Sequence, residues 1–197
     1  MRIPSTASLS TKLIRIGAGL LVLGLASIGL TLWVTWQLEG GAAAVNEAGR
    51  MRMQTWRLAS AVQAQLPTPE VQALVGQFDQ SLGLLRSGDP SRPLFVPWDG
   101  DVAREFTAVE VLWQQQRPQW LAASQSDAQR SVQAAGVFVD AIDRFVLAIE
   151  RQLSGFTAIL NLFQFVMMAL AIGGAVIMLY TGYLYVINPL ANLRDGL

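Results

Sequence analysis

The sequence has 197 residues, of which 52% are hydrophobic and 14% are charged. Soluble domains carry about 25% charged residues, so this composition indicates a membrane protein. The 14 basic and 14 acidic residues cancel, which argues against a nucleic-acid partner held by bulk charge. The absence of His and Cys from the sequence excludes histidine acid–base chemistry, a phosphoacceptor histidine, thiolate nucleophiles and most zinc sites. We therefore expect this chain to be no enzyme and to hold neither a metal nor a cofactor.

Two uncharged segments are long enough to cross a bilayer. The first runs from Ile16 to Trp36 and the second from Leu153 to Ile187, and a transmembrane helix needs about 20 apolar residues. We therefore predict transmembrane helices at residues 16–37 and 159–187. A cleaved signal peptide ending near Ala42–Ala44 is the alternative, but the apolar core of a signal peptide usually holds only about 7–15 residues.

The charges that flank the first span predict its orientation. The tail at residues 1–15 carries three basic residues, Arg2, Lys12 and Arg15, and positive charge favours the cytoplasmic side. We expect a two-pass protein of the bacterial inner membrane, with both termini in the cytoplasm and residues 38–158 in the periplasm. Aromatic residues mark the expected membrane interfaces: Trp33, Trp36, Tyr180, Tyr183 and Tyr185.

Residues 38–158 show the pattern of four helices. The expected fold class is all-α, with an antiparallel four-helix-bundle sensor domain between two transmembrane helices. The helices are expected at residues 42–66, 69–86, 101–123 and from about 126 into the second span. The positions expected inside the bundle recur at helical spacing: Ala44, Ala48, Met51, Thr55, Leu58, Val62 and Leu66; Val71, Leu74, Val75, Phe78, Leu82 and Leu85; Val102, Phe106, Val109, Trp113 and Trp120; Val132, Ala135, Val139, Ile142, Val146, Ile149, Leu153 and Phe156.

The connections between these helices carry recognisable signals. Thr68 is expected to cap the second helix, with Pro69 in its first turn. Ser126 and Gln129 form a candidate capping box for the fourth helix. The linker at residues 87–100 contains three prolines that break regular structure. Three of its side chains are expected near lipid headgroups: Leu94, Phe95 and Trp98.

Arg52 is the unusual residue of the first helix. At 100° per residue it lies about 80° from the centre of the apolar stripe, whereas Arg50 and Arg57 face away from the stripe. No acidic residue lies three or four positions from Arg52. One interpretation is that an acidic residue of another helix pairs with it, or that it extends to solvent. The other is that two chains pair through this helix, so that two facing Arg52 side chains hold a planar oxyanion.

Residues 46–58 read Asn-Glu-Ala-Gly-Arg-Met-Arg-Met-Gln-Thr-Trp-Arg-Leu. This segment resembles the P-box of the nitrate/nitrite sensor histidine kinases of the NarX and NarQ type, which reads approximately N-x-A-G-S-L-R-M-Q-S-Y-R-L. The resemblance implies a homodimer that binds nitrate or nitrite through Arg52 at its axis and shifts its helices lengthwise. Weaker candidates for contact with the ligand are Gly49, Met53 and Arg57.

The sequence departs from that P-box pattern at two positions. Arg50 replaces a small polar residue and Trp56 replaces a tyrosine, so the choice among nitrate, nitrite and another oxyanion stays open. The layout of the chain is also similar to the N-terminal domain of the type IV pili methyl-accepting chemotaxis transducers. After the second span, Asn188-Pro189-Leu190 resembles the start of a HAMP domain, incomplete at residues 188–197.

The leading hypothesis is the sensor and membrane part of a two-component receptor. The chain itself would have lipid, a second copy of itself and nitrate or nitrite as partners, and a kinase or response-regulator system would act downstream. Its longer parent protein would be a sensor histidine kinase, of which this chain is a fragment or a truncated product. One alternative is a related bundle receptor for another small ligand in chemotaxis or pilus control. The other is a membrane-anchored interaction protein that binds no ligand.

Overall fold

The computed structural model describes residues 9–122 and 128–183. They form four α-helices, α1 (Leu9–Gln63), α2 (Thr68–Ser87), α3 (Gly100–Ala122) and α4 (Ala128–Gly182). Across these described ranges no strand is present, and the extended backbone is limited to an isolated bridge between Asp89 and Leu94. The predicted all-α class with four helices is therefore confirmed.

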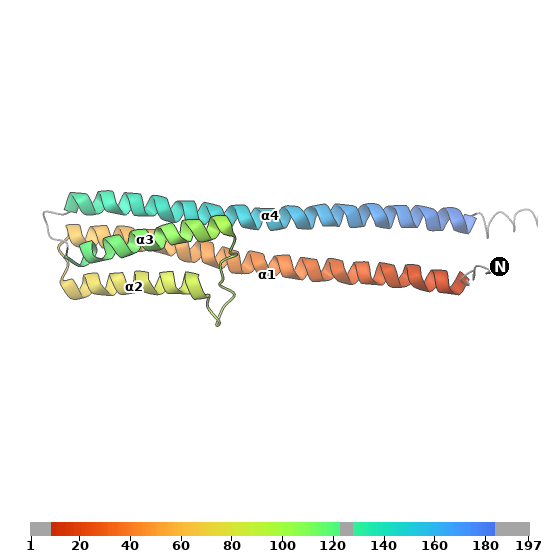
Figure 1. Ribbon diagram of the computed structural model, residues 1–197, viewed down its shortest axis with the longest axis horizontal. Helices are drawn as coiled ribbons and strands as arrows, with labels where there is room; N and C mark the ends of the chain where they lie inside the picture. Colours follow the sequence, from red (N-terminus) through yellow and green to blue (C-terminus); the bar gives the residue numbers. More distant parts are fainter. Residues whose placement is uncertain (1–8, 123–127, 184–197) are drawn as a thin grey trace, which may run out of the picture. The chain divides into compact units, whose positions relative to one another are not determined.

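The chain divides into two compact units. The first contains residues 1–31 and 157–197, and its described part is the apolar beginning of α1 and the apolar end of α4, whose large side chains are exposed. The second contains residues 32–156, which we call the helical bundle. Within the bundle, successive helices run in opposite directions (Figure 1). This alternation is the antiparallel arrangement that the sequence predicts.

All four helices contribute to the core of the bundle, which is largely aliphatic and aromatic. Ring contacts join the helices: Phe78 of α2 stacks on Trp113 of α3 with centroids 4.0 Å apart, and Phe106 of α3 lies 5.2 Å from Phe145 of α4. On α1 the predicted stripe from Ala44 to Val62 is buried. Burial of such a stripe is the main source of helix stability in a bundle.

The predicted seam of α4 is confirmed at Ala135, Ile142, Val146 and Ile149, which are buried, and it differs from the observed one at other positions. Val132 is exposed and Val139 is only partly buried, whereas Phe138 and Phe145 are fully buried. Phe138 and Phe145 adjoin the predicted seam, so the heptad spacing alone does not predict that they are fully buried. The aromatic rings decide the rotation, because Phe138 contacts both Phe78 and Trp113 and burial of an aromatic ring removes the most apolar surface from water.

The turn between α1 and α2 differs from the prediction at two residues. Helix α1 ends at Gln63, and Gln65 has a φ of 57°. The amide of Leu66 donates to the carbonyl of Ala61 at 3.0 Å, as in a Schellman-type helix end with a left-handed residue. Leu66 is therefore exposed and does not extend the stripe. Thr68 begins α2 but does not cap it, because the cap position is occupied by Pro67 and no side chain caps the helix.

The connection from α2 to α3 is an ordered loop at residues 88–99. Gly88 ends α2 with a φ of 77°, and a Cβ at this position would lie 2.9 Å from the carbonyl oxygen of Leu94. Asp99 caps α3 by accepting a hydrogen bond from the amide of Val102 at 2.7 Å. Leu94 is buried, so its predicted place near lipid headgroups is wrong, whereas Trp98 is exposed. Four predictions lie outside the described residues: Arg2, Tyr185, the capping box at Ser126 and the HAMP start at 188–197.

Candidate functional site

The P-box-like segment lies in the middle of α1, within the helical bundle. Its Arg52 points toward α4, where Nη1 lies 2.8 Å from Oδ1 of Asp143. The two side chains are 42% and 44% exposed, so water screens their attraction and such pairs contribute about 0–1 kcal/mol. Of the two interpretations of Arg52, the structure shows the one in which an acidic residue of another helix pairs with it.

The structure brings one of the weaker candidates close to Arg52 and separates the other two. A Cβ built on Gly49 would lie 3.5 Å from Nη2 of Arg52, which places the guanidinium beside the glycine. Met53 and Arg57 are exposed, as is Trp56. These outward residues share the solvent face of α1 and do not converge on Arg52 within the chain.

A second charged residue of the same segment, Glu47, is fully buried with 0% of its surface exposed. Its Oε2 accepts a hydrogen bond from Nη2 of Arg92 at 3.0 Å, and Nη1 of Arg50 lies 3.5 Å away. Its Oε1 is buried without a hydrogen-bond partner among the described residues. A carboxylate removed from water is unfavourable unless a cation accompanies it. Glu47 therefore requires Arg92, and this pair ties the 88–99 loop to α1.

Arg92 is positioned for that contact by Asp89. Oδ2 of Asp89 accepts from Nε of Arg92 at 2.8 Å, and Oδ1 accepts from both the amide and the hydroxyl of Ser91. These hydrogen bonds, with the Ser91 hydroxyl as the largest cause and Arg92 next, lower the pKa of Asp89 from 3.8 to about 2. The pKa of Arg92 is raised, first by Asp89 and then by Glu47. Asp89 in the loop thus holds Arg92, and Arg92 in turn bonds to Glu47 on the buried side of α1.

The loop also packs on α1 through aromatic contacts. The ring of Phe95 stacks on Trp36 with centroids 4.2 Å apart. It lies directly over Gly40, where an added Cβ would collide with the ring. Glycine is therefore required at position 40 for the ring to approach the helix backbone. Gly40 and Glu47 are seven residues apart on one side of α1, so Phe95 and Arg92 hold the loop at two points two turns apart.

Sequence reasoning found Arg52 but missed Glu47, Arg92 and Asp143. Glu47 lies between Ala44 and Met51 on the buried stripe, and a carboxylate at such a position on the helical wheel is a signal for a buried ion pair. The partners Arg92 and Asp143 are 45 and 91 residues away along the chain. No local spacing rule identifies partners at such separations, because the bundle topology creates these contacts.

The arrangement is a set of ion pairs that join elements of the bundle. Within the described residues, no group of three or more His, Asp, Glu or Cys side chains could hold a metal ion. The ion pairs hold α1 to α4 through Arg52 and α1 to the loop through Glu47. These are the contacts whose making or breaking would change how α1 sits in the bundle.

Comparison with known proteins identifies the bundle. Helices α1 and α4 each contain a segment long and apolar enough, by length and composition, to cross a membrane, and these two segments, which flank the bundle in the sequence, fit a two-pass membrane protein. No curated protein matches the sequence. The family model described as type IV pili methyl-accepting chemotaxis transducer N-terminal domain (PilJ) matches residues 33–137, more than half of the chain. The resemblance to the nitrate/nitrite sensor kinases is therefore not supported, and the chain belongs to the family of the N-terminal domain of type IV pili methyl-accepting chemotaxis transducers.

Proposed function

We propose that this chain is the sensing and membrane-spanning part of a two-pass transducer that acts in chemotaxis or pilus control. The observation that carries the proposal is the continuity of two helices. Helices α1 (Leu9–Gln63) and α4 (Ala128–Gly182) each contain an apolar segment and a core segment of the bundle without a break. A hydrogen-bonded helix is stiff along its axis, so a shift of about 1–2 Å in the bundle is passed to the apolar segment. Membership in the transducer family supports the same role.

We place the movable contact at Arg52 and Asp143. This pair joins the two continuous helices, and both side chains are accessible to water. A pair of this kind contributes about 0–1 kcal/mol, so its loss changes the ratio of two packing states by at most about fivefold. The pair of Glu47, which is fully buried, and Arg92, which is partly buried, holds the loop more firmly. In this mechanism the loop stays fixed to α1 while α1 and α4 change their lengthwise register.

A chimera tests the signalling role. Residues 1–187 would be joined to the cytoplasmic part of a characterised chemoreceptor, and the activity of its kinase would be measured with the wild-type sequence and with Asp143→Asn. We expect Asp143→Asn to change the kinase activity, whereas Arg104→Gln, in an exposed pair with Asp101, should leave it unchanged. Equal activity in all three chimeras, at equal expression in the membrane, would contradict the proposed movable contact.

The orientation can be tested because the natural sequence has no cysteine. We propose that the bundle lies in the periplasm, with both termini in the cytoplasm. A single cysteine at exposed Ser91 should react with a membrane-impermeant maleimide in intact cells, whereas a cysteine in the tail at residues 1–15 should react only after lysis. The reverse labelling pattern would show the opposite orientation.

The second candidate function is the binding of nitrate, nitrite or another oxyanion by Arg52 in a homodimer. It is supported by the P-box-like segment and by the accessibility of the guanidinium, which uses Nη1 for Asp143 and lies beside Gly49. An anion at this position would compete with Asp143. The ion pair itself is also what the hypothesis of a ligand-free interaction protein predicts, so the two ideas need a direct test.

That test measures the thermal stability of the detergent-solubilised chain with nitrate, nitrite, sulfate and chloride. A ligand that binds only the folded state raises its stability. Under the oxyanion hypothesis, nitrate or nitrite stabilises the protein, Arg52→Ala abolishes the effect and Asp143→Asn strengthens it by removing the competing carboxylate. No specific shift in the wild type or in Asp143→Asn would favour the ligand-free hypothesis. Sedimentation of the same samples determines whether the chain is a dimer.

A further inference from the structure

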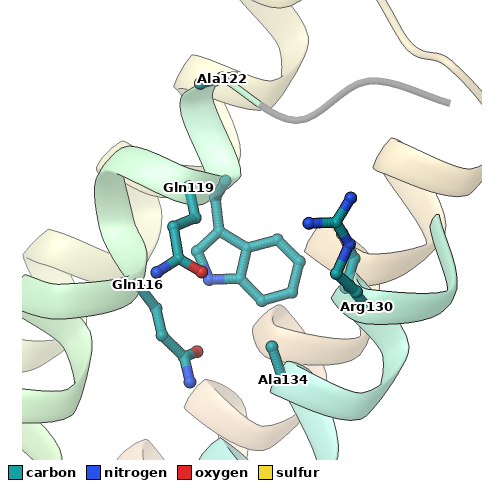
Figure 2. Close-up of a pocket in the computed structure, with 7 residues that line it drawn as sticks. Gln116, Gln119, Ala122, Arg130 and Ala134 are labelled. Atoms are coloured by element: carbon teal, nitrogen blue, oxygen red, sulfur yellow. The ribbon is translucent and has the colours of Figure 1, made fainter. Parts of the chain in front are cut away.

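The two ends of the helical bundle carry different side chains. At the end where α3 stops and α4 begins, the polar residues Gln116, Gln119 and Arg130 line a pocket (Figure 2). At the opposite end, where α3 begins, α1 carries two exposed tryptophans, Trp33 and Trp36. Exposed indole rings are typical of the boundary between a membrane and water, so this aromatic end of the bundle is the one suited to contact with lipid.

The sequence around Trp36 indicates the depth of this residue in a bilayer. Arg15 and Glu39 are 24 positions apart with no charged residue between them, which corresponds to about 36 Å of helix. The hydrocarbon core of a bilayer is about 30 Å thick. A helix that crosses the core with this segment therefore has Trp36, three residues before Glu39, in the layer of the lipid head groups.

The loop between α2 and α3 reaches the same level as Trp36. The ring of Phe95 stacks on Trp36 with centroids 4.2 Å apart. The hydrogen bond from Arg92 to Glu47 holds the loop to α1 about three turns further along the helix. Because Phe95 contacts Trp36 directly, a membrane surface that reaches Trp36 also reaches this part of the loop.

A groove with a volume of about 390 Å³ lies between Trp36 and the loop residues 89–95. Its lining combines apolar and charged groups, since it contains the rings of Trp36 and Phe95 together with Pro93 and Arg92. Arg92 is 36% exposed, and its hydrogen bonds to Asp89 and Glu47 use Nε and Nη2 but not Nη1. An arginine beside apolar rings matches a phospholipid head group, in which a phosphate adjoins the carbons of glycerol.

We propose that this groove holds the head group of a phospholipid and thereby attaches the loop to the membrane surface. The phosphate lies toward Arg92, and the glycerol carbons pack against Trp36 and Phe95. The occupant is lipid because the groove continues directly from the last residue of the uncharged segment of α1. Every phospholipid carries the phosphate, so neutral phosphatidylcholine is sufficient. The attachment does not depend on the signalling role proposed above, so either proposal can fail while the other stands.

The absence of cysteine from the sequence allows a direct test with a single fluorescent label. Pro93→Cys at the exposed rim of the groove and Gln72→Cys, exposed near the start of α2, would each be labelled with bimane in the full chain in phosphatidylcholine nanodiscs. The quenchers are phosphatidylcholine with a nitroxide on its head group, phosphatidylcholine with a nitroxide in its acyl chain, and iodide in the water. We expect the head-group nitroxide to quench the label at position 93 most strongly, and iodide alone to quench the label at position 72.

Two tryptophan variants distinguish a head group in the groove from mere closeness of the loop to the membrane. Trp36→Ala removes one wall of the groove and should abolish most of the head-group quenching at position 93. Trp98→Ala is the matched control and should leave it unchanged, because Trp98 is similarly exposed, at 46% against 51%, but does not line the groove. Circular dichroism confirms that each variant keeps its helix content. Strongest quenching at position 93 by iodide or by the acyl-chain nitroxide, quenching there by none of the three agents, or equal effects of the two tryptophan variants would overturn the proposal.

Discussion

Removing the guanidinium of Arg92 should destabilise the bundle far more than the loss of an ordinary surface arginine. Glu47 is fully buried, and its Oε2 lies 3.0 Å from Nη2 of Arg92. Breaking a buried ion pair by removing one partner costs about 3–5 kcal/mol, because the other charge stays buried. Arg92 is itself 36% exposed and Arg50 remains 3.5 Å from the same oxygen, so we expect Arg92→Met to cost less than a fully buried pair would, and still more than the loss of a surface arginine. Methionine preserves the apolar stem of the side chain.

The assay is thermal unfolding of the detergent-solubilised chain, followed by far-ultraviolet circular dichroism. For a chain of this size, 1 kcal/mol lowers Tm by about 2–4 °C. We expect Arg92→Met to lower Tm by more than about 4 °C, which is the upper limit that this conversion gives for a surface pair. The matched control is Arg104→Met, because Arg104 pairs with Asp101 at 2.9 Å with both side chains more than 60% exposed. This control should lose about 0.2–1 kcal/mol.

The double variant Glu47→Gln with Arg92→Met tests whether the unpaired carboxylate of Glu47 causes the loss of stability in Arg92→Met. If the destabilisation of Arg92→Met comes from the stranded carboxylate, replacing that carboxylate with a neutral amide should recover part of the stability. We expect the double variant to be more stable than Arg92→Met alone. A double variant that is equally or less stable, or an Arg92→Met whose Tm matches Arg104→Met, would refute the claim that Arg92 neutralises a buried charge.

Three further predictions concern the loop and the end of α1, each checked by the same unfolding measurement. Gly40→Ala should lose about 1–3 kcal/mol, because its Cβ would meet the Phe95 ring, whereas Gly76→Ala, with nothing within 4 Å of its Cβ in the middle of α2, should gain about 0.5–1 kcal/mol. The stabilising effect of Asp89, whose pKa is lowered from 3.8 to about 2, should be complete above about pH 5 and lost progressively as the pH falls through 3.8 and then through about 2, and Asp89→Asn should remove this part of the pH dependence. Gln65→Gly should gain about 0.5 kcal/mol, because Gln65 has a φ of 57° that glycine adopts without a penalty.

The sequence predicts the buried side of α1 well and that of α4 only in part. On α1 the stripe from Ala44 to Val62 is flanked by polar residues, so its buried side is unambiguous. On α4 the predicted seam through Val132 and Val139 competes with a seam through Phe138 and Phe145. The contacts of Phe138 and Phe145 with rings of α2 and α3 decide between them, and a single helix does not contain that information.

Contacts with other parts of the chain also decide which charges matter at the candidate site. They make Glu47 of α1 more important for stability than Arg52. The sequence singles out Arg52 because no acidic residue lies three or four positions from it along the helix. The structure pairs it with Asp143, where both side chains are accessible to water and the pair contributes little. Glu47 has Arg50 three residues away, yet it lies on the apolar stripe and is fully buried. The energetic effect of a charge depends on its desolvation more than on its nearest sequence neighbour. In the mechanism proposed above, the weak and accessible pair of Arg52 and Asp143 is therefore the contact that changes, while Glu47 and Arg92 keep the loop on α1.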